Sequence, residues 1–269
     1  RMSRFFIFIS LERCVMKRYQ QYIMPVLCLI VVLAVWEFSV QFFGIDLYVL
    51  PAPSDIVKAI GSEFGTLWMH SMVTLQEAVI GLLIATVLAV LIAILMDLNR
   101  TFRHSVFPYL VVSQTVPVMV LGPLFTMWLG FGLAPKIFMV VFMCFFPIAI
   151  AFSDALQHVN RNQINLLRSF GANLLQQYLY VKIPTAAPAL FSGLKVSATY
   201  CIGGAIVGEW LSASAGLGYY MIRVKNGFLM DKVFACVIMI VIWSLLLNFA
   251  VTLLERILFP YTRKRTGVS

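Results

Sequence analysis

Six apolar stretches of about 20 residues each dominate this chain of 269 residues. A helix needs about 20 mainly apolar residues to cross the roughly 30 Å hydrocarbon layer of a bilayer, so each stretch has the length of one membrane span. The stretches are continuously apolar, whereas barrel strands alternate in polarity over about ten residues. The sequence therefore predicts an all-α membrane protein with about six transmembrane helices. The predicted spans are Ile23–Phe43, Val73–Met96, Val106–Leu129, Lys136–Ser153, Ala187–Leu211 and Val233–Leu254.

The net charge of +9 raises the question of a nucleic-acid partner, which the placement of the basic residues answers. With the N-terminus inside the cell, the inner segments hold three times as many Lys and Arg residues as the outer ones, as expected of cytoplasmic loops. We therefore predict a lipid environment, no nucleic acid, and both termini on the cytoplasmic side of the membrane. The inner residues are Arg1, Arg4, Arg13, Lys17, Arg18, Arg100, Arg103, Arg161, Arg168, Lys182, Lys195, Arg256, Arg263, Lys264 and Arg265; the outer ones are Lys58, Lys136, Arg223, Lys225 and Lys232.

Three regions are expected along the chain. Residues 1–22 combine basic residues with the short apolar cluster Phe5–Leu11. We interpret them as a cytoplasmic or interfacial segment rather than a signal peptide, because no small-residue cleavage site follows. The transmembrane domain then occupies 23–258, and a basic cytoplasmic tail occupies 259–269.

Prolines and glycines break the apolar pattern at two places. The stretch 51–55, Pro-Ala-Pro-Ser-Asp, stops one helix and offers a cap for the next, so a short external helix is expected after Ser54. Pro117, Gly122 and Pro123 interrupt the third span and free backbone groups that protein or water must satisfy. Such a break marks a transport path or is a tolerated kink, and the sequence leaves both interpretations open.

The polar interval that ends at Pro184 predicts two short helices on the cytoplasmic side, around Gly171, with the loop at about 158–184. Gly171 is followed by nine residues and then Val-Lys-Ile-Pro. This spacing resembles the cytoplasmic motif of membrane subunits of binding-protein-dependent ABC importers, which is Glu-Ala-Ala, three residues, Gly, nine residues, Ile, one residue, Leu-Pro. Here Asn165-Leu166-Leu167 replaces Glu-Ala-Ala, which puts the polar contact at Asn165 in doubt. An ordinary loop with a glycine turn is the alternative.

Further stretches extend the resemblance over nearly all of the chain after about residue 23. They resemble the permeases of the nitrate, sulfonate and taurine importer family, and within it most closely those assigned to pyrimidine precursors of thiamine. The stretches are Trp36-Glu37, Leu50–Ser54, Thr74–Ala78 with Gly81, Ser113–Pro117, Gly122–Leu124, Trp128–Gly132, Cys144–Ile148, Gly208–Leu211 and Gly216–Tyr219.

The resemblance implies a type I ABC importer permease fold with a cytoplasmic coupling-helix loop. It also implies a second permease copy, two ATP-binding subunits and an external solute-binding protein. The sequence has no Gly-rich loop ending in Gly-Lys-Ser or Gly-Lys-Thr, so ATP and Mg would bind the partner ATPase, and this chain would bind no cofactor and not be an enzyme. Glycine permits the sharp turn, and proline would end the second helix. The expected ATPase-docking residues are Arg168, Ser169, Phe170, Gly171, Ala172, Asn173 and Pro184.

Glu209, towards the outer end of the fifth span, has two interpretations. A carboxylate near a bilayer is costly unless it faces water, a partner or a ligand, so Glu209 is a candidate to accept an aminopyrimidine on the solute pathway. Equally, it caps a helix or pairs with Arg223 or Lys225. The spans hold few cations, and Lys195 is expected to snorkel to the headgroups. This favours a heteroaromatic solute over sulfonate, taurine or nitrate; a riboflavin-like solute is a further alternative. The candidate pathway residues are Gln114, Thr115, Pro117, Glu209 and Trp210.

The remaining glycines, glutamates, histidines and cysteines of note are interpreted as structural residues. Gly204 and Gly208, four apart, allow another helix to approach closely, either at a dimer interface or within one subunit. Glu37 and Glu77 are interpreted as structural pairs. The histidines and cysteines lack ligand spacing, so no metal site is expected.

Two other function classes remain to be weighed against the importer. An ion-driven secondary transporter would need coupling-ion sites, and the scarcity of acidic residues at the membrane midplane counts against it. An intramembrane enzyme is less favoured because no paired catalytic constellation stands out.

Overall fold

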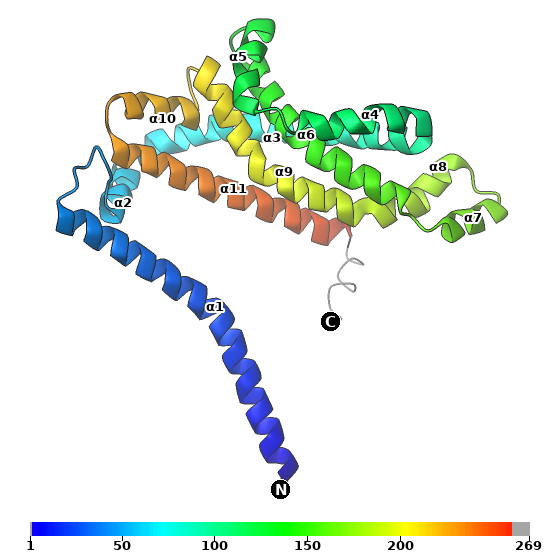
Figure 1. The fold of residues 1–269 in the computed structure, drawn as a ribbon, viewed down its shortest axis with the longest axis horizontal. Coiled ribbons are helices and arrows are strands. Elements are labelled where there is room, and N and C mark those ends of the chain that lie inside the picture. The colour runs from blue at the N-terminus through cyan, green and yellow to red at the C-terminus, as the bar shows by residue number, and fades with distance from the viewer. Residues whose placement is uncertain (1, 260–269) are drawn as a thin grey trace. The chain divides into compact units, whose positions relative to one another are not determined.

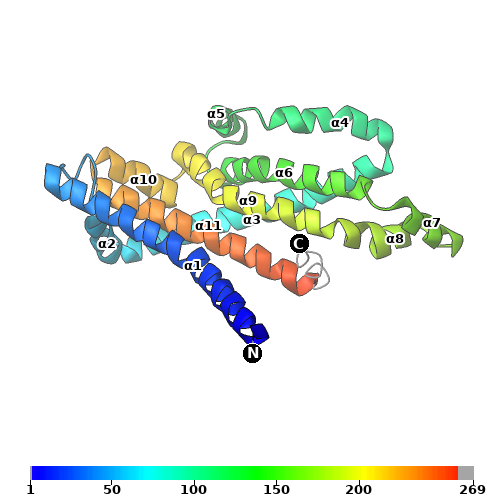
Figure 2. The same ribbon diagram turned by 60° about the horizontal axis from the view of Figure 1, so that its bottom comes forward.

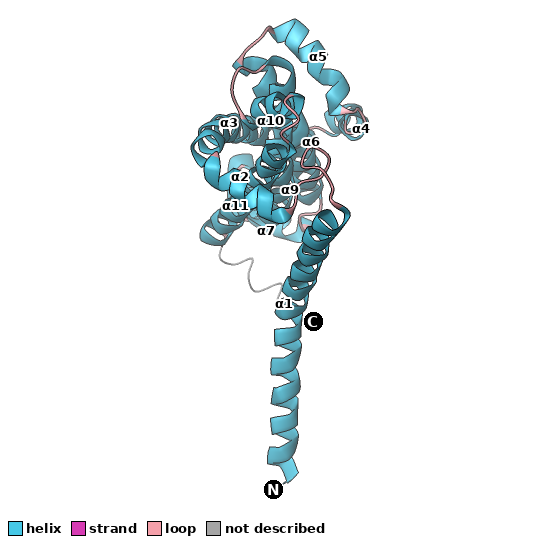
Figure 3. Cartoon of the chain, turned by 90° about the vertical axis from the view of Figure 1, so that its left-hand side faces the viewer, coloured by secondary structure: helices cyan, strands magenta, loops and turns pink. Residues whose placement is uncertain are grey.

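A computed structural model describes the backbone of residues 2–259 and the side chains of residues 23–259. Helices joined by loops make up this described part, with no strand in it (Figures 1 and 3), which confirms the predicted all-α class. The predicted basic tail falls on residues 260–269, outside the described part. The helices are α1 (Met2–Phe43), α2 (Pro53–Ser62), α3 (Phe64–Leu98), α4 (Arg100–Ser113), α5 (Val118–Leu129), α6 (Leu133–Gln157), α7 (Arg161–Ser169), α8 (Leu174–Gln177), the π-helix η1 (Tyr178–Lys182), α9 (Ile183–Ser212), α10 (Leu217–Asn226) and α11 (Met230–Leu258).

The predicted number of about six spans is confirmed within residues 2–259. Five helical segments are long and apolar enough to cross a membrane, and α4 with α5 makes a sixth if the bent pair counts as one span. Helix α1 extends back from the first span to Met2, and the interfacial placement of its first part stays a prediction. The five segments are Ile23–Phe43, Phe64–Leu98, Leu133–Gln157, Leu174–Ser212 and Met230–Leu258.

The third span is not the single helix predicted at Val106–Leu129. Its two halves, α4 and α5, meet at an angle of 107°. Pro117 causes the break because it lacks an N–H, and with φ −63° and ψ 118° it caps the start of α5 in an extended conformation. Gly122 and Pro123, predicted to share in the interruption, lie inside α5 and remain helical.

Contacts divide the chain into two units, of which the first comprises residues 1–64 and 224–235. Within it, the Glu37 carboxylate of α1 accepts the N–H of Ser54 at 3.0 Å and its hydroxyl at 2.8 Å. Helix α2 therefore starts as predicted at the Pro-Ala-Pro-Ser stretch, but Glu37 satisfies its first turn and Ser54 is not the cap. The structural role predicted for Glu37 is thus a helix-capping one.

The second unit, residues 65–223 and 236–269, contains the long helices α3, α6 and α9 and the larger part of α11, which run side by side in Figures 1 and 2. Small residues line the buried face of α3 at intervals of three or four, the spacing of one helix face. None of the alanines in this row is exposed to solvent. The row is Ala78, Gly81, Ala85, Ala89 and Ala93.

Helices α6 and α9 pack closely through the two glycines marked in the sequence. A Cβ added at Gly204 would lie 3.1 Å from the Cα of Val140, and one at Gly208 would lie 2.8 Å from the Cα of Lys136. Small residues bring membrane helices together by allowing backbones to approach. Of the two interpretations of these glycines, the contacts support packing within the subunit.

We expect Gly208→Ala to destabilise the protein by about 1–3 kcal/mol, because the added methyl would meet α6 backbone that cannot give way. Gly203→Ala on the same helix is the matched control, since a Cβ there meets nothing within 4 Å. Unfolding in detergent, followed by circular dichroism, should show a loss of stability for Gly208→Ala alone. Equal effects of the two substitutions would contradict this account of the α6–α9 interface.

Candidate functional site

Two helix caps shape the predicted docking turn, which comprises residues 168–173. Gly171 has φ +78°, a left-handed conformation that glycine adopts without strain. Its N–H donates to the carbonyl of Arg168 at 2.9 Å, and the N–H of Ala172 donates to the carbonyl of Leu167 at 3.0 Å, so α7 ends in a Schellman motif. Asn173 then starts α8 with a capping box, since it exchanges side-chain and backbone bonds of 2.9 Å with Gln176. The turn therefore has a defined shape.

This turn and α7 present an uncovered surface. No residue of α7 is buried, and the Phe170 side chain is 79% exposed. Sequence reasoning missed the exposed leucines around it, although Leu166 belongs to the Asn-Leu-Leu stretch compared with the importer motif. The added surface residues are Leu166, Leu174 and Leu175.

The structure groups six of the seven predicted docking residues on this turn. Ser169, Phe170, Gly171 and Asn173 are exposed, and Ala172 is half-buried. The Arg168 guanidinium forms a hydrogen bond within the chain, because its Nε donates to Gln177 Oε1 at 3.2 Å.

Pro184 lies elsewhere, and the prediction that it ends the second helix was wrong. The chain stays helical from Leu174 to Ser212. Residues Tyr178–Lys182 form a π-helix just before Pro184, and Pro184 occupies the first turn of α9. The π-turn changes which backbone groups hydrogen-bond to each other just before the proline, whose N–H is missing. The helix therefore continues past Pro184.

An acidic residue at the end of α3 anchors the segment after the turn. Asp97 Oδ2 accepts the Tyr178 hydroxyl and the Lys182 ammonium, the latter at 2.5 Å. The Lys182 ammonium also lies 4.7 Å from the centre of the Tyr178 ring. The Asp97 side chain is only 6% exposed. Sequence reasoning missed this anchor, because no local spacing relates Asp97 to residues more than 80 positions later.

A cavity of about 170 Å³ lies beside the break between α4 and α5. Gln114 is the one predicted pathway residue in its wall; Thr115 and Pro117 are exposed neighbours at the break. Aromatic rings and other apolar groups form most of the lining, with no charged side chain. The lining residues are Ser113, Gln114, Val116, Val118, Phe142, Met143, Phe146, Pro147 and Tyr200.

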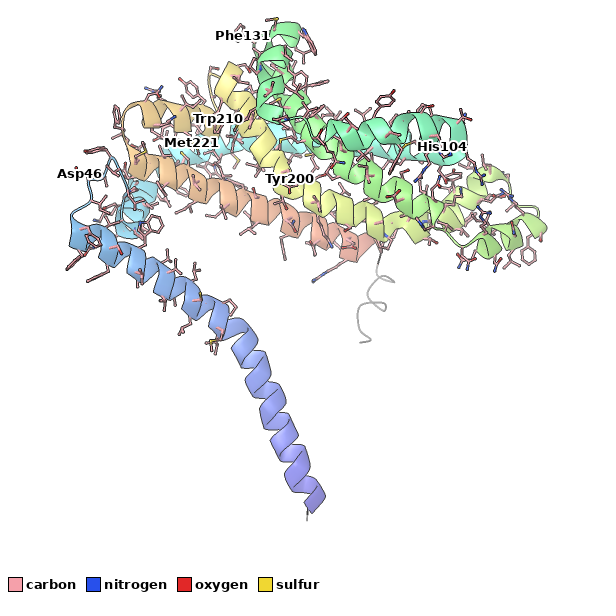
Figure 4. All side chains as sticks on the ribbon, in the orientation of Figure 1. Asp46, His104, Phe131, Tyr200, Trp210 and Met221 are labelled. Carbon is pink, nitrogen blue, oxygen red and sulfur yellow. The ribbon has the colours of Figure 1, made fainter. Side chains whose placement is uncertain are left out.

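Glu209 and Trp210 do not line this cavity. Trp210 lies nearer the C-terminal end of α9 than Tyr200 does (Figure 4) and is 38% exposed. Glu209 is 2% exposed, and its Oε2 accepts the N–H of Gly218 at 2.6 Å in the first turn of α10. The structure therefore favours the helix-capping interpretation of Glu209 over a pair with Arg223 or Lys225.

Helix α3 supplies the partners for the neighbouring backbone groups. Thr74 Oγ1 donates to Glu209 Oε1 at 2.6 Å and accepts the N–H of Leu217 at 2.8 Å. His70 Nδ1 accepts the N–H of Gly216 at 3.1 Å. Three successive N–H groups at the start of α10 are thus satisfied by buried side chains, which such groups require away from water.

Lys136, predicted as the first residue of the fourth span, completes this arrangement. It lies in α6, 7% exposed, and its ammonium donates to Glu77 Oε1 at 2.5 Å. Glu77 is therefore in a structural ion pair, as predicted. We call the side chains of His70, Thr74, Glu77, Lys136 and Glu209 the Glu209 cluster.

Comparison with known proteins matches residues 81–264 to the family described as binding-protein-dependent transport system inner membrane component. The formylaminopyrimidine transport permease protein ThiX of Halalkalibacterium halodurans is 34% identical, over 93% of this chain and all of that protein. A probable ABC transporter permease protein of Haemophilus influenzae is also 34% identical, over 84% of this chain and 93% of that protein. An inward-facing structure of the MetNI methionine ABC transporter has a TM-score of 0.60 at 19% identity and covers 72% of this chain and 94% of its own.

Removing the α3 anchor should loosen the segment after the docking turn. We expect Asp97→Ala to destabilise the protein by about 3 kcal/mol, because it leaves the Lys182 ammonium largely buried without its partner. Asp154→Ala is the control: Asp154 pairs with Arg103 but is 45% exposed, so the loss should stay below about 1 kcal/mol. Hydrogen exchange of residues 174–182 should rise in Asp97→Ala only. Unchanged exchange there would refute the anchoring role.

Proposed function

The chain belongs to the binding-protein-dependent inner membrane component family of ABC importers, and from that premise we propose that it forms half of an ATP-driven channel for a pyrimidine precursor of thiamine. The family and the type I importer permease fold make it a multi-pass inner-membrane transport subunit. Membership also counts against the secondary transporter and the intramembrane enzyme considered from the sequence.

The docking turn is the single observation that carries the ATP coupling. A partner can bind α7 and the turn without displacing any other part of the described chain, because no residue of α7 is buried. Caps at both ends fix the turn, so a movement imposed on it is passed on to α9 through the continuous helix from Leu174. We propose that a separate ATPase grips this turn and holds ATP and Mg, while this chain binds no cofactor.

The remaining assembly follows from this assignment. The docking turn faces the cytoplasm, as do both termini, in agreement with the excess of basic residues in the predicted inner segments. A second copy of the chain pairs with this one, one ATPase docks on each, and an external solute-binding protein delivers the solute. ATPase closure then shifts the pair between inward-facing and outward-facing states, which requires that the ATPase interacts differently with the two.

Two independent observations support a pyrimidine solute. The relative ThiX, named for formylaminopyrimidine transport, aligns over its full length. The cavity at the α4–α5 break has aromatic walls that include Phe142, Phe146 and Tyr200 and a polar amide from Gln114, without a charged side chain. These groups suit a flat uncharged ring, whereas a sulfonate, taurine or nitrate would be served better by Arg, Lys or helix N-termini.

The docking assignment predicts that Gly171→Val reduces retention of the ATPase at least fivefold when the complex is purified from membranes. Valine at φ +78° is strained, so the turn must change shape, although an added Cβ would meet nothing within 4 Å. Gly171→Asn is the control, since asparagine tolerates the left-handed region. Quantitative mass spectrometry of the co-purified ATPase measures the effect. Full retention of the ATPase by Gly171→Val would rule out the turn as the docking site.

The solute assignment predicts ATP-dependent uptake of an aminopyrimidine by vesicles that contain the complex and its binding protein. Gln114→Ala should lower the uptake about two- to tenfold, the worth of one hydrogen bond, without lowering ATPase retention. Gln76→Ala is the control, because Gln76 is an exposed glutamine of α3 outside the cavity. Uptake of a sulfonate, nitrate or riboflavin but not of a pyrimidine would overturn the solute assignment and leave the importer class intact.

A further inference from the structure

The Glu209 cluster contains more negative charge than its surroundings balance. Glu77 and Glu209 are each 2% exposed, and the Lys136 ammonium of the cluster pairs with Glu77. If both carboxyl groups were ionised, the cluster would carry one uncompensated negative charge inside a membrane-spanning bundle. Burying such a charge without a partner is very costly, and buried groups change protonation state instead.

The hydrogen bonds show which carboxyl oxygen lacks a donor. Glu209 accepts Thr74 through Oε1 and Gly218 through Oε2, so both of its oxygens act as acceptors. Glu77 accepts Lys136 through Oε1. Its Oε2 is fully buried, and no described residue donates to it. An oxygen in that position is satisfied if it shares a proton with a neighbouring carboxyl group.

Glu77 and Glu209 also interact directly with each other. Two adjacent buried carboxylates repel, and such pairs resolve the repulsion by sharing one proton. We propose that the Glu77–Glu209 pair is a proton-binding site that holds one proton between the two carboxyl groups, while Glu77 Oε1 keeps its bond to Lys136. Lys136, Glu77, Glu209 and the start of α10 then form one chain in which every donor meets an acceptor.

The other ionisable groups near the pair leave this charge count unchanged. His70 of α3 accepts the Gly216 N–H at Nδ1, so it is not doubly protonated, and its ring stacks on Tyr220 of α10 at 5.1 Å. Arg223 of α10 is exposed, and among the described residues it forms no ion pair with either carboxyl group. With one proton bound, the one remaining carboxylate charge of the pair cancels the charge of Lys136.

The proton has a structural consequence for four helices. Glu209 of α9 holds α10 through Gly218, Glu77 belongs to α3, and Lys136 belongs to α6. Loss of the proton would place two carboxylates against each other where these helices meet. Bound, it joins them by a neutral set of hydrogen bonds, which the low dielectric of the bundle strengthens. The proposal does not depend on the solute or on the docking partner.

Infrared difference spectroscopy of the purified, lipid-reconstituted protein tests the proposal. The spectrum of wild type minus Glu77→Gln at neutral pH should show the carbonyl stretch of a protonated carboxylic acid, shifted in heavy water. Wild type minus Glu209→Gln should show it too, because either amide leaves one glutamate that ionises to balance Lys136. Glu37→Gln is the control and should show only carboxylate bands, since Ser54 donates to both Glu37 oxygens.

The same sample supplies a test that needs no variant. In wild type, alkaline titration should remove the carboxylic acid band and add carboxylate absorption equivalent to one group per chain. The double variant Glu77→Gln/Glu209→Gln leaves Lys136 without a counter-charge, so it should be recovered from membranes at least fivefold less well than either single variant. Difference spectra that contain only carboxylate bands, with no titrating acid band in wild type, would overturn the proposal.

Discussion

The arrangement depends on one constraint, which is that polar groups inside an apolar bundle must find partners within the chain. Continuous helices satisfy their own backbones, so the constraint acts where helices start or end. At the start of α10, the N–H groups of Gly216, Leu217 and Gly218 have no partners in their own helix, and side chains of α3 and α9 accept them. Gly216, at φ +116°, sets the turn that aims these groups inward. The need for acceptors at one helix start explains why a carboxylate, a hydroxyl and an imidazole gather among apolar helices.

Close helix packing gives that polar cluster its geometry. A Cβ at Gly208 would press on the Lys136 backbone, so the glycine lets α6 approach one turn of α9 directly beside Glu209. Gly81 plays the same part between α3 and α6, where a Cβ would lie 2.5 Å from the Cβ of Val140. Small residues thus bring the backbones together, and the long polar side chains of Lys136 and Glu77 then reach each other in the space that remains. The buried ion pair therefore depends on the close packing of these helices.

The sequence predicted what composition and local chemistry decide. The apolar stretches predicted the spans, the prolines at 51–55 predicted α2, and Gly171 predicted the turn between two short helices. It did not predict contacts between residues far apart in the chain. Lys136 was predicted at the outer end of the fourth span, and only the fold brings Glu77 of α3 to it. Pro184 was expected to end a helix because proline lacks an N–H. Local rules cannot anticipate the π-turn before it, which lets the helix continue.

Helix α3 links the two ends of the bundle. Asp97 near its C-terminal end holds Tyr178 and Lys182, which follow the docking turn, while Thr74, near its other end, holds the start of α10. At 1.5 Å per residue these two anchor points are about 35 Å apart, more than the thickness of the hydrocarbon layer. Helix α9 makes a second link, since it is continuous with α8 and carries Glu209 into the same cluster. Two helices that share partners at both ends cannot slide past each other without breaking buried hydrogen bonds. A displacement of the docking turn is therefore transmitted to α10 as a movement of α3 and α9 together. A membrane subunit needs this behaviour if its motor lies on one side of the bilayer and its solute arrives on the other.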